Sequence, residues 1–211
     1  MKRTHLVRHH VSYNPPIVIK IPHRIHQEIH GITPKISDLS LKMRQYDKLV
    51  QLSVSIKNWM RAYEREFDEV PIDVGLEIIE AKKKELLKEV EKLIKDKIKK
   101  VQHIKGLGVR YLAGLLAYAH PKDFPNVGRY LYYCGYTKAS KLTKRYNRKV
   151  CGLVFQIVET MIKCKDPKYY PLYLKIKSEL PREYPKIKRH RIAVNRIGTI
   201  FLKDFYHLFH E

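Results

Sequence analysis

Cysteine is scarce in this chain of 211 residues, and its pattern argues against two kinds of site. Cys134, Cys151 and Cys164 are an odd number, and no two of them form a C-x-x-C pair. A disulfide framework needs paired cysteines in a small secreted chain, and a structural zinc site needs ligands at short fixed spacings. We therefore expect three unpaired thiols in the core.

Long apolar runs are also missing. No stretch approaches the roughly 20 apolar residues that span a bilayer, and the N-terminal MKRTHLVRHH lacks the apolar centre of a signal peptide. We expect no membrane partner and an intracellular protein, in the cytoplasm, on a nucleoid or in a virion. Asn and Gln are few beside Lys, Glu, Ile and Tyr, a balance typical of thermophilic proteins.

Acidic residues are outnumbered two to one, 21 against 43 Lys and Arg, which leaves a formal charge of +22. The excess is uneven, because residues 38–104 hold 15 basic and 13 acidic residues whereas residues 105–150 hold 10 and 1. A surface of this charge repels itself unless a polyanion neutralises it. The partner we expect is nucleic acid, bound by the second half of the chain.

Three regions follow from the composition along the chain. Residues 1–37 are a basic arm rich in His and Pro, with one short β-branched run at 17–21. Residues 38–104 predict two helices, over 38–67 and about 73–103, that form an antiparallel hairpin or coiled-coil stalk. Residues 105–211 predict a compact helical domain. Apart from the arm, the fold class is all-α.

A seven-residue repeat marks the second of these helices, at Ile79, Leu86 and Leu93 and again at Leu87, Ile94 and Val101. Such a stripe favours either pairing with a second copy, which would make the protein a homo-oligomer, or packing inside its own chain. The period is the same in both cases, so both interpretations remain open.

The helical domain divides into predicted helices over 109–119, 126–134, 147–164, 167–180 and 187–209. Gly135 is expected just beyond the second of them, in the left-handed conformation that ends many helices. Between residues 137 and 149 the sequence predicts a basic loop.

A Gly-Leu-Gly turn opens this domain. Its pattern, apolar, any residue, Gly, apolar, Gly, is typical of a helix-hairpin-helix motif, whose free backbone N–H groups contact successive phosphates. The alternative is an ordinary tight turn between helices. The phosphate-binding residues expected here are Lys105, Gly106, Leu107, Gly108 and Arg110.

A second cluster of cations follows, interleaved with tyrosines. Lys and Arg neutralise phosphates and tyrosines stack on unpaired bases, so the mixture favours DNA, with RNA as the other polyanion it fits. The alternative is a solvated loop beside a tyrosine-rich core. The cations are Lys138, Lys141, Lys144, Arg145, Arg148 and Lys149, and the tyrosines are Tyr132, Tyr133, Tyr136 and Tyr146.

Metal and cofactor signals are weak. His23, His26 and His30 have the spacing of one helical face, but Pro22 precedes them and no fourth ligand is near. The acidic residues form no set suited to two metal ions. We expect no metal, no cofactor and no catalytic group from the residues themselves.

From about residue 80 to 209 the chain resembles the C-terminal domain of the insertion-sequence transposases related to the Piv DNA invertase. The matching stretches are, in order, HIKGLGVRYLAGLLAYA, DFPNVGRYLYYCGY, TKRYNRKV, PKYYPLYLKIKSEL and KIKRHRIAVNRIGTIF. The resemblance implies a helical domain that binds DNA. In that family a RuvC-like domain supplies four acidic metal ligands, and a serine of the C-terminal domain is the nucleophile.

Two departures from the family weaken the case for catalysis. About 37 residues precede the first helix, too few for a RuvC-like fold, and the nearest counterpart of the serine, Ser140, is followed by Lys141 where the family commonly has glycine. A serine without a base or metal has no means of activation. We expect a non-catalytic DNA-binding protein. The alternatives are a serine-dependent recombinase completed by a partner, and a structural protein that coats DNA in chromatin or a virion.

Overall fold

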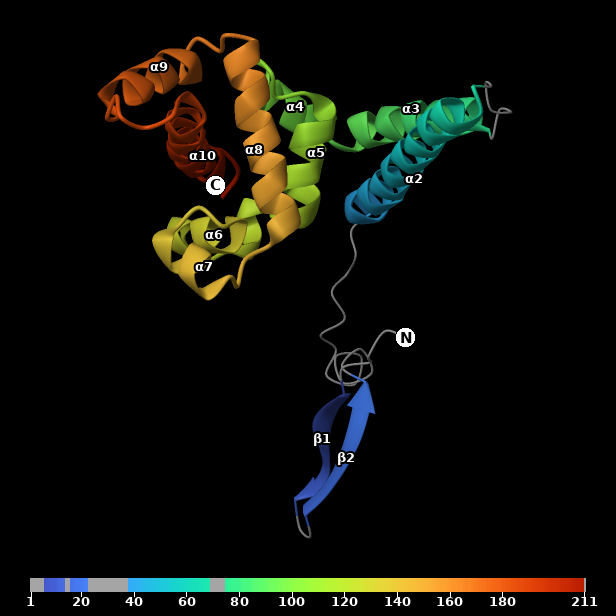
Figure 1. Cartoon of the computed structure of the whole chain (residues 1–211). Helices are drawn as coiled ribbons and strands as arrows, with labels where there is room; N and C mark the ends of the chain where they lie inside the picture. The colour runs from blue at the N-terminus through green and yellow to red at the C-terminus, as the bar shows by residue number, and fades with distance from the viewer. Residues whose placement is uncertain (1–5, 14–15, 23–37, 69–74, 211) are drawn as a thin grey trace. The chain divides into compact units, whose positions relative to one another are not determined.

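The computed structural model describes residues 6–13, 16–22, 38–68 and 75–210, and it forms two units, Met1–Ile36 and Ser37–Glu211 (Figure 1). In the first unit, β1 (Leu6–Tyr13) and β2 (Pro16–Pro22) pair in an antiparallel two-stranded sheet, with Leu6 opposite Pro22 and an irregularity between His10 and Ser12. The β-branched run expected as one strand lies within β2. Its partner β1 had no comparable sequence signal.

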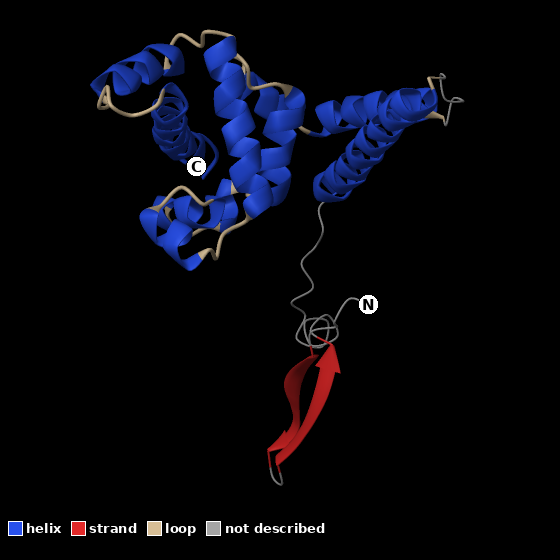
Figure 2. Ribbon diagram, viewed as in Figure 1, coloured by secondary structure: helices blue, strands red, loops and turns tan. Residues whose placement is uncertain are grey.

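The second unit is all-α, and Figure 2 draws its described residues as helices and loops alone. Its first helix, α2 (Asp38–Phe67), has the predicted bounds. α3 (Leu76–Leu93) runs antiparallel to it, since Lys42 Nζ donates to Glu89 Oε2 and Ser53 Oγ to Glu80 Oε1. The predicted second helix is interrupted at Ile94, whose φ of −112° ends α3 before α4 (Lys95–Val101) begins.

The remaining helices follow the predicted order. They are α5 (Val109–Tyr118), the short 3-10 helix η1 (Pro121–Asp123), α6 (Val127–Cys134), α7 (Lys138–Thr143), α8 (Arg148–Lys163), α9 (Tyr169–Glu179) and α10 (Lys186–His210). Gly135 has φ 82° and ends α6 as expected. The predicted loop over 137–149 is wrong in part, because its first half forms α7.

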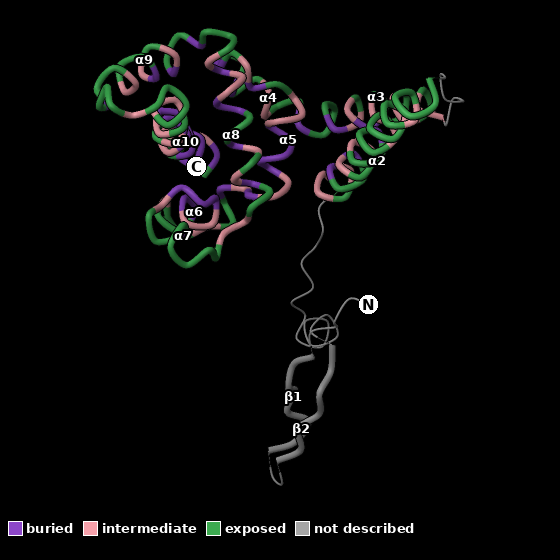
Figure 3. The backbone as a smooth tube through the Cα atoms, viewed as in Figure 1, coloured by how far each residue is buried: buried purple, intermediate pink, exposed green. Residues whose placement is uncertain are grey.

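The core lies among α5, α8 and α10, whose facing sides are buried in Figure 3. Leu115 of α5, Ile157 of α8 and Phe201 of α10 are each fully buried. Burial of one such side chain contributes about 2 kcal/mol. The C-terminal helix is therefore a central element of the domain.

The seven-residue stripe is largely used within the chain. Leu86, Ile94 and Val101 are buried in the same core cluster as residues of α2 and α5, whereas Leu93 is 44% exposed. The intrachain interpretation thus explains most of the stripe, and a second copy is not needed to cover it.

Candidate nucleic-acid interface

A continuous run of sequence forms the most basic surface of the second unit. Between Asp123 and Glu159 the chain has seven basic residues and no acidic residue. All seven are exposed, on α6, on α7, in the loop after α7 and in the first turn of α8: Arg129, Lys138, Lys141, Lys144, Arg145, Arg148 and Lys149. We call this set the basic surface. Among the described residues, only Lys149 of this set is paired with a carboxylate.

Side-chain caps fix the backbone under the basic surface. Thr137 and Ser140 form a reciprocal capping box that starts α7, and Lys144 adopts a left-handed φ of 54° that ends it. The Asn147 side chain then accepts hydrogen bonds from the backbone N–H groups of Lys149 and Val150 and starts α8. Each cap is local, so these few residues suffice to position the cations.

The start of α8 is an unfavourable place for cations. A helix N-terminus carries a partial positive charge, and Arg148 and Lys149 occupy the first two positions after the Asn147 cap. Each cation there costs about 0.3–1 kcal/mol when no anion is near. A bound phosphate would remove that cost, which makes this turn a favourable place for one.

A groove brings the start of α8 together with Arg110 of α5. It has a volume of about 220 Å³ and contains Arg110 from α5 with Arg148 and Lys149 from α8. Gly114 and Gly152 line it between these cations, and Met43 and Asp47 of α2 also contribute. Of the eleven residues predicted to bind nucleic acid, the tertiary fold gathers these three cations around one concave surface.

Asp47 occupies the cationic end of this groove. Its Oδ2 lies 2.5 Å from Lys149 Nζ and accepts a hydrogen bond of 2.6 Å from the Tyr118 hydroxyl. Lys149 Nζ also lies 3.8 Å from the centre of the Tyr118 ring. Burial, and next the bond to Asp47, raise the pKa of Tyr118 well above its usual range, so the hydroxyl stays a donor. The Asp47 carboxylate thus neutralises Lys149 at this end of the groove.

The Gly-Leu-Gly turn itself faces the interior more than predicted. Gly106 has φ 92°, and a Cβ there would lie 2.9 Å from backbone atoms of Thr160 and Met161 in α8. Leu107 is buried, and the Lys105 N–H donates to Asp166 Oδ2 at 2.8 Å. The Leu107 side chain therefore belongs to the core, and packing explains the conformation of Gly106. Contact of this turn's backbone with phosphate stays a prediction.

The open part of the turn is Gly108. No atom lies within 4 Å of where its Cβ would stand, and it occupies the N-cap position of α5. However, the turn packs at the C-terminal end of α8, while Arg148 and Lys149 lie at the N-terminal end. A helix of 16 residues is about 24 Å long, so the turn and the basic surface are separate features.

The interleaved tyrosines mostly support the basic surface. Tyr136 is buried against Gly198, and the Tyr132 hydroxyl bonds with Thr143 Oγ1 across α6 and α7. Tyr133 accepts a hydrogen bond from Asn147 and donates to a backbone carbonyl. The ring of Tyr146 packs on Gly135. These contacts favour the alternative interpretation, in which the tyrosines belong to a core beside a solvated segment, over stacking of the rings on bases.

Ser140, the candidate nucleophile, is fully buried. Its Oγ donates to the Thr137 carbonyl at 2.8 Å and accepts from the Thr137 N–H at 3.2 Å, both parts of the start of α7. A nucleophile must reach the atom that it attacks and needs a base or metal beside it. The position of Ser140 instead gives it a structural role.

The thiols and histidines have no metal-binding arrangement in the described part of the chain. Cys134 is buried, which raises its pKa to about 12 and keeps the thiol protonated. Cys151 is half-buried, and Cys164 is exposed, so the expectation of three core thiols is wrong for Cys164. His23, His26 and His30 lie outside the described residues.

Sequence reasoning missed Asp47, Tyr118 and Gly152, which shape the groove. Asp47 lies in a helix with many charges of both signs, and Gly152 lies inside an apolar helix. Neither has a local pattern that indicates a ligand site. Asp47 and Tyr118 become neighbours of Arg148 and Lys149 only because α2 packs on α5 and α5 packs on α8.

Comparisons with protein-family models, with curated proteins and with solved structures each give no match. The resemblance to transposase C-terminal domains therefore remains a prediction from the quoted stretches. None of the helices among the described residues combines the length and apolar character needed to cross a membrane.

Proposed function

We propose that this chain binds DNA without cutting it, as a relative of transposase C-terminal domains, and that the basic surface and the groove beside it hold the phosphate backbone. The observation that carries the proposal is the run of seven exposed cations between Asp123 and Glu159 with no acidic residue among them. Exposed cations on one segment give a field that attracts a polyanion and exchange their counterions for phosphates.

Arg110 extends this surface beyond the basic segment. It lines the same groove as Arg148, so a strand that follows the groove would meet cations from two helices. Asp47 neutralises Lys149 in the free protein, and a phosphate that enters the groove would have to compete with this carboxylate. Affinity is then expected to depend on both the cations and Asp47.

The test is the binding of duplex DNA, single-stranded DNA and structured RNA as a function of salt, by fluorescence anisotropy. Six or more phosphate contacts should lower duplex affinity about a thousandfold between about 50 and 200 mM salt. Arg110→Ala and Arg148→Ala should each weaken binding and reduce the slope of log affinity against log salt by about 1. Asp47→Asn should strengthen binding about fivefold, because a repelling charge is removed.

Lys175→Ala is the matched control, since Lys175 is an exposed cation of α9 outside the groove. It should leave affinity and slope close to those of the parent. An affinity that does not respond to salt, or an equal effect of Lys175→Ala and Arg148→Ala, would contradict the proposed surface. Cooperative binding with the same affinity for duplexes of any sequence would identify a protein that coats DNA and not one that binds a specific site.

We also propose that the protein self-associates through α2. Leu52, Trp59 and Phe67 are 48–54% exposed, and Ile56 and Tyr63 between them are partly exposed. Their steps of three and four residues make a second apolar stripe beside the one that packs on α3. A helix with the same spacing would cover it, and a second copy of α2 supplies one.

A further inference from the structure

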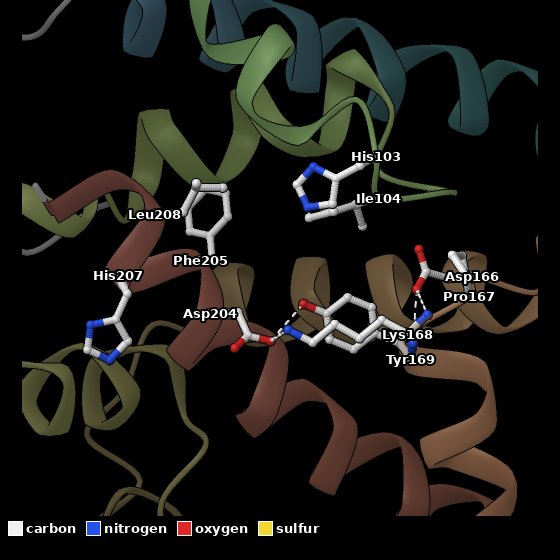
Figure 4. Close-up of a pocket in the computed structure, with 10 residues that line it drawn as sticks. All are labelled: His103, Ile104, Asp166, Pro167, Lys168, Tyr169, Asp204, Phe205, His207 and Leu208. Atoms are coloured by element: carbon white, nitrogen blue, oxygen red, sulfur yellow. Dashed lines mark hydrogen bonds and ion pairs between the residues drawn. The ribbon is translucent and has the colours of Figure 1, made fainter.

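A pocket lies at the other end of α8 from the basic surface. It has a volume of about 450 Å³ and is enclosed by the turn before α5, the loop between α8 and α9, and α10 (Figure 4). Its apolar walls are Ile104, Pro167, Phe205 and Leu208. A space of this size accepts a planar heterocycle with room for an attached group.

Asp166 fixes the shape of this pocket. Its carboxylate is buried and accepts three backbone hydrogen bonds, from Lys105 at 2.8 Å, Lys168 at 2.8 Å and Tyr169 at 2.9 Å. It thereby ties the turn before α5 to the start of α9. Because these three bonds hold the two segments in place, the pocket is formed before any ligand binds.

The polar groups of the pocket include both acceptors and donors. Asp204 Oδ2 accepts from the Tyr169 hydroxyl and pairs with Lys168 Nζ, each at 2.9 Å. Among the described residues, Asp204 Oδ1 has no hydrogen-bond donor. In Figure 4 the exposed His103 ring stands across the pocket from Tyr169 and Asp204. A ligand would therefore meet an open acceptor on one side and an aromatic ring on the other.

From this geometry we infer that the pocket binds an unstacked nucleobase, either from a free nucleotide or from an unpaired residue in a strand. A base edge carries N–H donors for Asp204 Oδ1 and acceptors for Lys168, and its flat face suits the His103 ring. A simple anion fits less well, because Asp166 and Asp204 both line the pocket.

The phosphate attached to such a base has cations nearby. Lys105 and Lys165 adjoin the lining residues Ile104 and Asp166 in sequence, and both are exposed. No carboxylate of the described residues pairs with either side chain. The inference does not depend on the basic surface, since the pocket lies at the opposite end of α8.

The experiment titrates the full chain with AMP, GMP and ribose 5-phosphate by calorimetry, and then with a single strand that carries one 2-aminopurine. AMP or GMP should bind while ribose 5-phosphate does not. His103→Ala should weaken base binding at least about fivefold, the lower end of the range for one stacked base. Gln102→Ala is the matched control, because Gln102 is exposed in the same turn but does not line the pocket.

The titrations with free nucleotides and with the single strand distinguish the two sources of the base. Loss of single-strand affinity in His103→Ala, with duplex affinity unchanged, would identify an unpaired residue of a strand, whereas an effect on AMP or GMP alone would identify a free nucleotide. Equal binding of ribose 5-phosphate and AMP, or equal effects of His103→Ala and Gln102→Ala, would overturn the inference. Far-ultraviolet circular dichroism of each variant checks that the helical fold is intact. The salt dependence of duplex-DNA affinity tests the basic surface separately from this pocket.

Discussion

Gly106 excludes a side chain for two independent reasons, its φ of 92° and its contact with the backbone of α8. A left-handed conformation disfavours any residue with a Cβ, and the atoms that a Cβ would meet belong to a helix backbone, which cannot move aside alone. The pattern of the Gly-Leu-Gly turn located this glycine correctly. Its neighbours show that the glycine is required by packing on α8.

Gly106→Ala should therefore lower the free energy of unfolding by about 2 kcal/mol or more, from strain and overpacking together. Gly108→Ser is the matched control, because its Cβ enters open space and serine is favoured at an N-cap. Urea unfolding followed by circular dichroism measures both. Equal midpoints for the two variants would show that the turn does not pack tightly on α8.

Tyrosine is the residue type whose role was hardest to assign from sequence. Tyr132, Tyr133 and Tyr136 lie between Arg129 and Lys138 in the chain, and tyrosines that stack on bases also lie close to cations. In the fold their hydroxyls and rings join α6 to α7, to α8 and to Gly198. A ring buried on one helix face and a ring that stacks on a base have the same local sequence, so tertiary contacts alone distinguish them.

At the scale of elements, α2 and α3 are joined by a charged network around Glu80. Its carboxylate accepts hydrogen bonds from Lys83, Ser53 and Lys57, and these bonds, that from Lys83 most, lower its pKa to about 2. Ser53 is buried between the helices, so the network crosses the contact between α2 and α3. This pairing depends on the charged form of Glu80.

The pairing of α2 and α3 should weaken as the pH falls from about 4.5, the ordinary pKa of a glutamate, to about 2. Since the folded pKa lies below the unfolded one, the unfolded chain takes up the proton first, and acid favours unfolding. The melting temperature of the parent should therefore exceed that of Glu80→Gln at neutral pH, and the difference should shrink over this window.

Glu91→Gln serves as the control, because Glu91 is exposed on the same helix and has no ion pair with a described residue. Its effect on the melting temperature should be small at every pH. A difference between parent and Glu80→Gln that stays constant from neutral pH to about pH 2 would mean that the charge of Glu80 does not stabilise the pair.

At the scale of the whole molecule, the basic surface and the exposed apolar stripe of α2 lie on different helices of the second unit. The basic surface lies on α6, α7, the loop after α7 and the start of α8, whereas the exposed aromatic residues Trp59 and Phe67 lie on α2. This separation allows nucleic-acid binding and self-association to be tested independently.

Trp59→Ser combined with Phe67→Ser should convert an oligomer to a monomer, because these rings contribute most of the exposed apolar stripe of α2. Light scattering after size exclusion measures the mass. Ile187→Ser is the control, since Ile187 is 67% exposed on α10, away from that stripe. A monomeric parent protein, or a loss of mass in the control as well, would exclude α2 as the interface.

The sequence by itself determined the all-α class of the second unit, the bounds of α2 and the order of the later helices. It did so because their signals are local: Gly135 as a helix end, and apolar residues at helical spacing. The break at Ile94 and helix α7 were missed, since neither is marked by proline or a long periodic stretch.

Only the tertiary structure decided which residues share a site. Arg110, Asp47 and Arg148 come from three helices and meet in one groove because α2 packs on α5 and α5 packs on α8. Leu107 and Ser140 are both buried, although their local sequences resemble those of exposed functional residues. A local pattern can place a residue on a helix or in a turn, but its exposure and its neighbours depend on residues distant in the chain.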